Sequence, residues 1–251
     1  MNFAYLISGH VKNYKECLSN HSKLLNTLIN DGHNVDCFIS TYNESGILDE
    51  GKRFVDIRDN KYDFNLNNIS SLDINNICEF FNPKLFNVDI NTKYSKSIPD
   101  KFLKIVMEDM SSFYHTNRMY KKIIETISLM ERYEYENCIE YDFFIRTRFD
   151  VTVNVKEFIL DEYLNGCSSS DMFHDVFFYG KRKILNKLKN INYYMDKLFK
   201  EHIQRIKLDE KLEWSRLPFK NPEHLFNVFL NDENIKYKIH DFSPYIPRIK
   251  L

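Results

Sequence analysis

The sequence is poor in residues that favour tight turns: its 251 residues include only six glycines and six prolines. This scarcity argues against a loop-rich all-β protein and against a collagen-like chain. Charge of one sign is not in excess either, since 35 Lys and Arg stand against 36 Asp and Glu, giving a net charge of −1. A basic surface that binds nucleic acid is therefore not expected.

Cysteine pairs and long apolar runs are also lacking. The five cysteines are scattered and form no C-x-x-C motif, so neither a zinc site nor a dithiol redox motif is predicted. An odd, dispersed set is typical of free thiols in a reducing compartment. No run approaches 18 apolar residues, and the first residues lack the features of a signal peptide. We therefore expect no transmembrane segment and a cytoplasmic location, in a bacterium or in a host cell.

The first forty residues have the pattern of a βαβ unit. Residues 3–7 form a nearly continuous apolar run, which is typical of a strand buried on both faces of a sheet. Helical spacing of apolar residues predicts a helix over about 14–29, with Asn13 as its N-cap. A second strand is predicted over 35–40, and the crossover between the two strands is expected to be right-handed.

The rest of the chain predicts an α/β protein. Residues 43–100 are polar and rich in Asn, so we expect a loop-rich insertion there with one short strand at 85–90. Further strands and helices are predicted at 113–135, 143–148, 176–179, 185–203, from Asn221 onward, and 235–239. Together they indicate one domain over 1–251, built as a mixed sheet flanked by helices.

The strongest local signal is the segment YDFFIRTRFD at 141–150, where an apolar strand runs into three charges. Alternation places Arg146, Arg148 and Asp150 on one side if the strand continues. Charges at the carboxyl end of a buried strand are costly unless they are paired or bind a ligand. Two guanidiniums can bind a diphosphate, and Asp150 can hold a divalent metal, a ribose hydroxyl or an arginine. A structural Arg–Asp network is the alternative.

Two further polar groups follow the first two strands. After the first strand comes Ser8-Gly9-His10, and Asn13 stands at the start of the helix behind it. A glycine lets the backbone approach a ligand, and free N–H groups of the helix can bind phosphate. The segment lacks both common phosphate-loop patterns, so an ordinary turn is the alternative. Thr41 and Tyr42 end the second strand, where they can bind and stack on a base or simply belong to the core.

Two acids later in the chain are candidates for acid–base chemistry. Asp175 follows His174 just before a predicted strand, where it can bind an acceptor, act as a general base or cap a loop. Glu223 lies in the first turn of the helix predicted from Asn221, where the helix dipole favours a carboxylate in any case. His224 is expected to be structural.

Taken together, five blocks of the sequence resemble GT-A-like glycosyltransferases found in bacterial polysaccharide clusters and in large DNA viruses. These blocks are ISGHVKNY, VDCFIST, YDFFIRTRFDV, HDVFFYG and NPEHLFNVFL. In that group an R-x-R-x-D strand end stands where other GT-A enzymes carry a metal-binding D-x-D. The resemblance extends over about residues 3–240. It implies a GT-A-like, Rossmann-type fold that transfers a sugar from a nucleotide-sugar donor to a glycan or another hydroxyl acceptor.

The resemblance also implies roles for single residues. The donor would be bound by Ser8, Gly9, His10, Asn13, Thr41, Tyr42, Arg146, Arg148 and Asp150. Asp150 matches the second Asp of D-x-D and Arg148 takes the place of the first. Either a Mn²⁺ or Mg²⁺ ion is held by Asp150 and the donor diphosphate, or arginine charge replaces the metal. Arg148 would stabilise the leaving group, and Asp175 or Glu223 would be the base if the enzyme inverts.

Two other functions are compatible with the same blocks. A catalytically inactive glycosyltransferase-like module would bind a glycan or a protein without turnover. A sugar nucleotidyltransferase would also bind a nucleotide, but that class of enzyme usually has a Gly-rich, basic first loop. The segment Ser8–Asn13 holds one Gly and one Lys.

Overall fold

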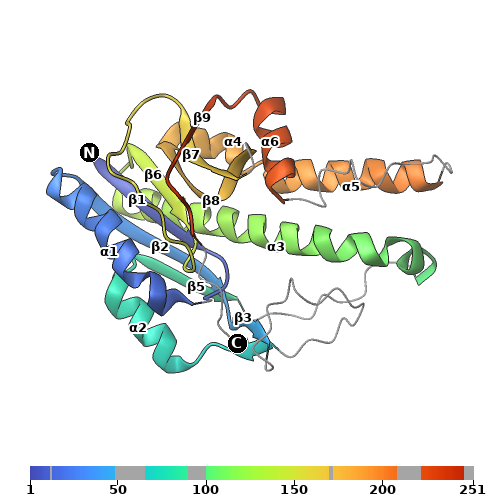
Figure 1. The fold of residues 1–251 in the computed structure, drawn as a ribbon, viewed down its shortest axis with the longest axis horizontal. Helices are drawn as coiled ribbons and strands as arrows, with labels where there is room; N and C mark the ends of the chain where they lie inside the picture. The colour runs from blue at the N-terminus through green and yellow to red at the C-terminus, as the bar shows by residue number, and fades with distance from the viewer. Residues whose placement is uncertain (12, 49–65, 90–99, 170–171, 208–221, 246–251) are drawn as a thin grey trace.

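A seven-stranded mixed sheet organises the chain in this computed structural model, which describes residues 1–11, 13–48, 66–89, 100–169, 172–207 and 222–245 (Figure 1). The strand order is β5-β2-β1-β6-β8-β7-β9. The strands of this sheet are β1 Asn2–Ser8, β2 Asn34–Tyr42, β5 Leu85–Asp89, β6 Phe143–Thr147, β7 Leu164–Ser169, β8 Met172–Lys181 and β9 Tyr237–His240. A separate antiparallel pair joins β3 Glu44–Leu48 to β4 Leu66–Asn68.

Strand direction decides where functional side chains can gather. Strand β1 pairs in parallel with both β2 and β6, and β2 pairs in parallel with β5, so four carboxyl ends meet at one edge of the sheet. Strand β8 is antiparallel to β6, and its first residues therefore lie at that same edge. We call this edge the carboxyl edge.

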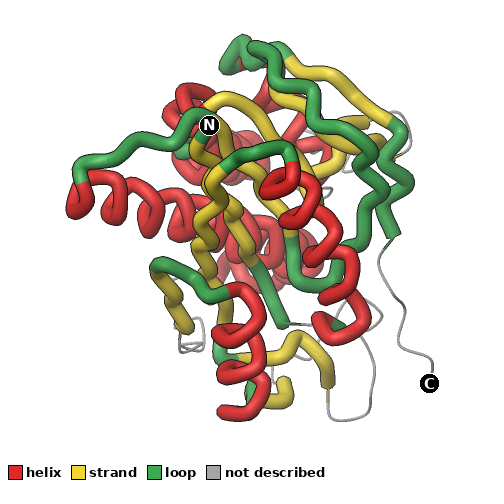
Figure 2. Tube along the Cα trace, turned by 90° about the vertical axis from the view of Figure 1, so that its left-hand side faces the viewer, coloured by secondary structure: helices red, strands yellow, loops and turns green. Residues whose placement is uncertain are grey.

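Helices cover both faces of the sheet (Figures 1 and 2). They are α1 Tyr14–Asn30, α2 Ser71–Phe81, α3 Asp100–Asn137, α4 Leu185–Leu188, α5 Ile191–Lys207 and α6 Pro222–Asp232, with a short 3-10 turn at Arg182–Ile184. Strand β1 is buried on both faces of the sheet, which accounts for its nearly continuous apolar run. Ala4 and Leu6 belong to one core, while Phe3, Tyr5 and Ile7 belong to the core on the opposite face.

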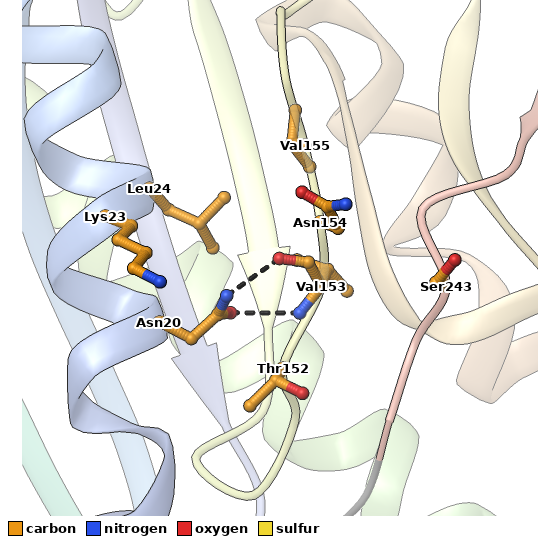
Figure 3. A pocket seen from close by; sticks show the side chains of 8 residues that line it. All are labelled: Asn20, Lys23, Leu24, Thr152, Val153, Asn154, Val155 and Ser243. Atoms are coloured by element: carbon orange, nitrogen blue, oxygen red, sulfur yellow. Dashed lines mark hydrogen bonds between the residues drawn. The ribbon is translucent and has the colours of Figure 1, made fainter.

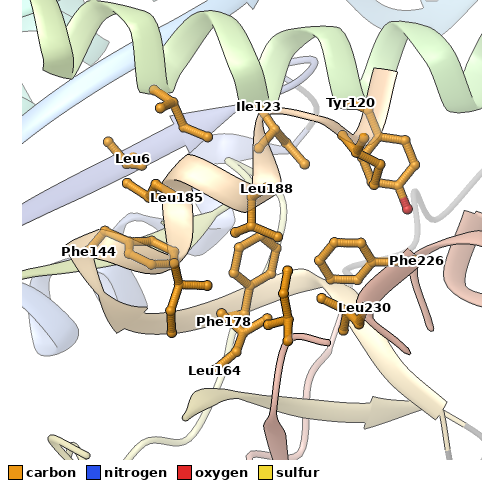
Figure 4. Close-up of a cluster of buried hydrophobic side chains, with 14 of the residues drawn as sticks. Leu6, Tyr120, Ile123, Phe144, Leu164, Phe178, Leu185, Leu188, Phe226 and Leu230 are labelled. Carbon is orange, nitrogen blue, oxygen red and sulfur yellow. The ribbon is translucent and has the colours of Figure 1, made fainter. Parts of the chain in front are cut away.

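The first of these cores joins the sheet to α3, α4 and α6 (Figure 4). Tyr120 and Ile123 of α3 contribute to it together with Phe144, Phe178 and Phe226 from the sheet and α6. Aromatic rings pack closely here, since the centroids of Phe178 and Phe226 lie 5.3 Å apart. This packing fixes α6 against β8, and both elements carry candidate site residues.

The expected mixed sheet flanked by helices is confirmed, with local differences. The part of 43–100 that is described is not loop-rich: it holds α2 as well as strands, because the Ser70 side chain accepts a hydrogen bond from the N–H of Asp73 and caps a helix. Helix α3 begins at Asp100 rather than 113, and the helix expected over 185–203 is divided into α4 and α5.

Strand β6 ends one residue earlier than expected, at Thr147, and holds only Arg146 of the three charged residues. Arg148 and Asp150 therefore lie beyond it, and alternation along a strand does not set their directions. All five cysteines are free thiols, as expected from their spacing. Within the described ranges, no helix is both long and apolar enough to cross a membrane.

Candidate functional site

The carboxyl edge brings together residues that are far apart in the sequence. Ser8 ends β1, Thr41 and Tyr42 end β2, and Arg146 lies in β6, which pairs directly with β1. Asp175 lies near the start of β8. Side-chain contacts link these residues from strand to strand, so most of the predicted residues lie in one region.

Arg146 is a buried guanidinium in the centre of this region, with 1% of its surface exposed. Its Nε donates to the Ser8 hydroxyl over 3.2 Å, and Nη1 donates to the backbone carbonyl of Asp175. The guanidinium carbon lies 5.7 Å from the ring centre of Phe178. Nη2 is buried and has no hydrogen-bond partner in the described part of the chain. Burial lowers the pKa of Arg146 to about 10, although Asp175 opposes this, so the side chain stays cationic at pH 7.

Arg148 and Asp150 form a bidentate ion pair. Nε lies 2.8 Å from Oδ1 and Nη2 lies 2.7 Å from Oδ2, a geometry that guanidinium and carboxylate share. The Asp150 side chain is 2% exposed and that of Arg148 is 24% exposed. Burial alone lowers the pKa of Arg148, but the charge of Asp150 outweighs it and the pKa is raised.

This pair bears on the expected metal at Asp150. Both carboxylate oxygens already accept hydrogen bonds from Arg148. A cation bound there would have to displace a guanidinium or share oxygens with it, so Asp150 as placed does not fit a metal site. Arg148 remains partly exposed at the carboxyl edge.

The two predicted acids are joined by a histidine. His174 Nδ1 lies 3.3 Å from Asp175 Oδ1, and His174 Nε2 lies 3.1 Å from Glu223 Oε1. Among the described residues these three side chains form the group of acids and histidines that is compact enough to hold an ion, with ligand atoms within 4.8 Å of one another. Strand β8 carries the first two residues and the first turn of α6 carries Glu223.

The two carboxylates differ in environment. Asp175 is buried with 4% of its side chain exposed, whereas Glu223 is 25% exposed. Burial alone raises the pKa of Asp175, but His174 and Arg146 outweigh it and the pKa is lowered. Burial raises the pKa of Glu223; His174 opposes this, and Asp175 adds a smaller contribution in the same direction as burial. Glu223 is therefore the acid of the pair that is open to solvent and closer to a protonated state.

The first turn and the end of β2 lie against each other. Gly9 has φ +119°, a conformation that favours glycine, and its N–H donates to the carbonyl of Ser40. Thr41 Oγ1 donates to the carbonyl of Gly9 over 2.8 Å. The rings of His10 and Tyr42 lie 5.0 Å apart. Gly9 and Thr41 are therefore linked by a hydrogen bond, and the ring of His10 lies against that of the buried Tyr42.

Asn13 precedes α1 as expected, but it does not cap the helix with its side chain. Its backbone is left-handed, with φ 40°, and its side chain makes no capping hydrogen bond. The expectation of a side-chain N-cap is therefore wrong, because a cap of that kind needs an extended backbone at this position.

A buried lysine near the same edge was missed by the sequence reasoning. Lys122 of α3 is fully buried, and its Nζ lies 2.6 Å from Asp89 Oδ2, 2.5 Å from Glu125 Oε2 and 4.5 Å from the centre of the Tyr42 ring. Ser40 donates to Glu125 over 3.0 Å. The available signal was the pair Lys122 and Glu125 three residues apart on a predicted helix, which usually indicates a solvated face.

A surface hollow of about 240 Å³ lies elsewhere, between α1 and the segment that follows β6 (Figure 3). Asn20 of α1 donates to the carbonyl of Val153 over 2.8 Å and accepts from its N–H over 2.9 Å. None of the predicted site residues lines this hollow. We therefore place the candidate site at the carboxyl edge, where the charged side chains converge.

Comparisons with known proteins give only a distant likeness. No protein-family model matches the chain, and no curated protein matches it. Among solved structures it is similar to the apo form of the glycosyltransferase GlyE in Streptococcus pneumoniae TIGR4, with 14% identity and a TM-score of 0.35. A second structure of GlyE gives 14% identity and a TM-score of 0.33.

The two matches cover 94% and 96% of this chain but 44% and 46% of those chains. The chain therefore spans less than half the length of the solved structures it matches. At this identity and TM-score the likeness does not assign an activity to the chain.

Proposed function

We propose that the chain is a GT-A-like glycosyltransferase that moves a sugar from a nucleotide-sugar donor to a hydroxyl acceptor. The observation that supports this most is that one edge of the sheet holds both cationic arginines, Arg146 and Arg148, and a partly exposed carboxylate, Glu223. Arg146 contacts Asp175, and the chain of contacts continues through His174 to Glu223. The reaction needs positive charge for its leaving group and a base for its acceptor, and this edge offers both.

The two arginines would act on the leaving diphosphate. As the bond between the sugar carbon and the diphosphate oxygen breaks, its electron pair and negative charge stay on the diphosphate. The negative charge on the diphosphate grows as this bond breaks. Fixed guanidinium charges therefore stabilise the transition state more than the ground state. Arg148 is 24% exposed and can touch the ligand, whereas buried Arg146 would act mainly through its field.

Glu223 is the proposed base. It is 25% exposed while Asp175 is 4% exposed, so an acceptor hydroxyl can reach Glu223 more readily. The acceptor O–H bond breaks, the proton moves to the Glu223 carboxylate, and the oxygen electron pair forms the new bond to the sugar carbon. A raised pKa makes Glu223 a better proton acceptor than an ordinary carboxylate at neutral pH.

The nucleoside would bind beside the first turn. His10 and Tyr42 present adjacent rings, and Gly9 lets the backbone approach a ligand without a side chain in the way. Ser8 and Thr41 would then hold this surface in place through their hydrogen bonds to Arg146 and Gly9. Because Asp150 is engaged by Arg148, we assign the diphosphate to arginine charge and derive no step through a metal ion.

A thermal-shift panel tests the proposal. The ligands are UDP, GDP, CMP and dTDP with their sugars, each in EDTA and again with Mn²⁺ or Mg²⁺. A ligand that binds the native state at a hundredfold excess over its dissociation constant stabilises it by about 2.7 kcal/mol. We expect one nucleotide class to raise Tm in EDTA and its sugar to be turned over. A well-folded sample that none of them stabilises would favour the inactive glycan- or protein-binding module instead.

A further inference from the structure

His174 lies between the two candidate acids in a way that the proposed reaction does not yet use. Its Nε2 lies 3.1 Å from Glu223 Oε1, and its Nδ1 lies 3.3 Å from Asp175 Oδ1. The side chain is 14% exposed, so the ring is held within the protein on most sides. A histidine that contacts a base at one nitrogen and a buried carboxylate at the other has the geometry of an orienting group.

The Nδ1 atom has a second neighbour of opposite kind. The backbone N–H of Val176 donates to Nδ1 over 3.3 Å, the same distance that separates Nδ1 from Asp175 Oδ1. In neutral His174 the Nδ1 lone pair accepts from Val176, and the ring proton is then on Nε2. In protonated His174 the Nδ1 proton is donated to Asp175 instead.

It follows that Nε2 carries a proton in both states of the ring. That proton faces Glu223 Oε1 at an Nε2–Oε1 distance of 3.1 Å, so the contact between His174 and Glu223 persists whether the ring is neutral or charged. The Val176 N–H and the Asp175 carboxylate exchange roles at the far nitrogen. The arrangement keeps Oε1 of Glu223 beside the imidazole in both states.

A bound cation is the competing use of the same three side chains. Their ligand atoms are close enough, and Asp175 Oδ2 is buried with no hydrogen-bond partner among the residues described. However, the two carboxylates face different nitrogens of the ring, and one nitrogen bonds one ion. Arg146 and Arg148 also act on Asp175 and already supply positive charge there. The geometry favours hydrogen bonding over metal binding.

We propose that His174 is a positioning residue that holds Glu223 as the base of the proposed glycosyl transfer. The inference rests on the proposed function, and it adds His174 to the two acids of the proposed site. Proton transfer itself follows the path given above, from the acceptor hydroxyl to Glu223, while the nucleoside diphosphate leaves with the electron pair of its bond. His174 keeps its Nε2 proton throughout.

Three histidine variants separate the parts of this role. His174→Ala removes the ring, His174→Gln keeps an amide N–H that can reach Glu223, and His33→Ala removes a histidine that stacks on Phe3 near the opposite end of β1. The activity probe is hydrolysis of whichever of UDP-glucose, UDP-galactose, UDP-N-acetylglucosamine and GDP-mannose stabilises the wild type. We expect His174→Ala to lower kcat about 10²-fold with little change in donor KM, because misplacing a catalytic group by about 1 Å costs that much. His174→Gln should recover most of the loss, and His33→Ala should match wild type.

A second readout does not depend on turnover. Carboxyl ¹³C NMR follows the titration of Glu223 directly, and the groups of the described residues that act on Glu223 include His174 and Asp175 of β8 and Tyr120 of α3. His174 lowers the pKa of Glu223 while Asp175 raises it. We therefore expect His174→Ala to move the titration of Glu223, and the acid limb of kcat/KM, to higher pH. Asp175→Asn should move both to lower pH.

The outcomes distinguish the inference from the proposed function. If wild type turns over a donor but His174→Ala leaves kcat and the Glu223 titration unchanged, His174 does not position the base. If no donor is bound or hydrolysed, the proposed function fails, and the NMR titration still shows whether His174 holds Glu223. Stabilisation of the wild type by Mn²⁺ or Zn²⁺ that is lost in His174→Ala would overturn the positioning role in favour of a metal site.

Discussion

Arg148 donates to both carboxylate oxygens of Asp150, over 2.8 Å from Nε and 2.7 Å from Nη2. The pair closes over two residues at the turn that follows β6, so each side chain fixes the direction of the other. Asp150 is buried and Arg148 remains partly exposed at the carboxyl edge. The carboxylate therefore orients a charge that can act on a ligand.

Replacing Arg148 tests whether that charge acts in catalysis. We expect Arg148→Ala to lower kcat by about 10²-fold or more, as the loss of other charge-stabilising donors does. The same change leaves Asp150 buried without its counter-charge, which costs up to about 3–5 kcal/mol when one partner of a buried pair is removed. Steady-state kinetics and urea unfolding measure the two effects.

The double variant Arg148→Ala with Asp150→Asn separates activity from stability. Removing the unpaired charge should recover much of the lost free energy of unfolding while kcat stays low. An active, fully stable Arg148→Ala protein would contradict the assignment, since it would leave the ion pair with neither a catalytic nor a structural role.

Replacing Ser8 tests how much its hydrogen bond to Arg146 contributes to stability. Its hydroxyl is fully buried and accepts from Arg146 Nε, so Ser8→Ala leaves a second guanidinium nitrogen without a partner. An unsatisfied buried donor costs about 1–3 kcal/mol, more for a charged group. Ser22→Ala is the control, because Ser22 is a surface residue of α1 that accepts from Asn26 over 3.4 Å. Equal urea midpoints for the two variants would show that the Ser8 contact contributes nothing.

Much of the site was predictable from residues whose burial is costly. Two arginines after an apolar strand had to be paired or used, and the structure places Arg146 in contact with Ser8 and Asp175, both predicted from other blocks. What a linear pattern could not supply is the partner of each group. Glu223 was predicted as a candidate base, with the helix dipole as the alternative reason for a carboxylate there, but its contact with His174 depends on how α6 packs against β8.

Lys122 and α2 show two different limits. Lysine on a helix is normally solvated, and only the meeting of α3 with the ends of β2 and β5 provides Lys122 with Asp89 and Glu125 as partners. Helix α2 was missed for another reason. Asn-rich composition favoured loops, while the Ser70–Asp73 capping pair that signals a helix start was present in the sequence and not used.

His21 predicts how stability depends on pH. Tyr5 O–H lies 2.8 Å from Nδ1, and Nε2 faces the Phe149 carbonyl at 3.3 Å, so the neutral ring donates from Nε2 and accepts at Nδ1. Burial lowers the pKa of His21 from 6.5 to about 4. The pKa of His21 is lower in the folded state than in the unfolded state. The stability that the neutral ring contributes is therefore complete above pH 6.5 and is lost as pH falls to about 4.

The lost stability is on the order of 3 kcal/mol for a shift of this size. The free energy of unfolding, measured with urea across this pH range, should change less with pH in His21→Gln than in wild type. His33→Gln, which removes an imidazole next to Phe3 at the other end of the sheet, is the control for histidine content. Identical slopes for His21→Gln and wild type would show that His21 is protonated without cost.

Lys122 makes the last prediction, because its charge is fully buried and holds Asp89 and Glu125 together. Lys122→Met leaves both carboxylates without this counter-charge and should destabilise the fold, whereas Lys121→Met removes a surface lysine 3.6 Å from the same Glu125 and should cost little.

The pKa of Asp89 is lowered, since Lys122 outweighs the effect of burial. This contribution is present above the unfolded pKa of about 4 and is lost as pH falls through the folded value. The difference in unfolding free energy between wild type and Lys122→Met should therefore be large at pH 7 and shrink toward pH 3. A difference that stays constant over this range would mean that packing of the lysine stem, rather than its charge, stabilises the junction of α3 with β2 and β5.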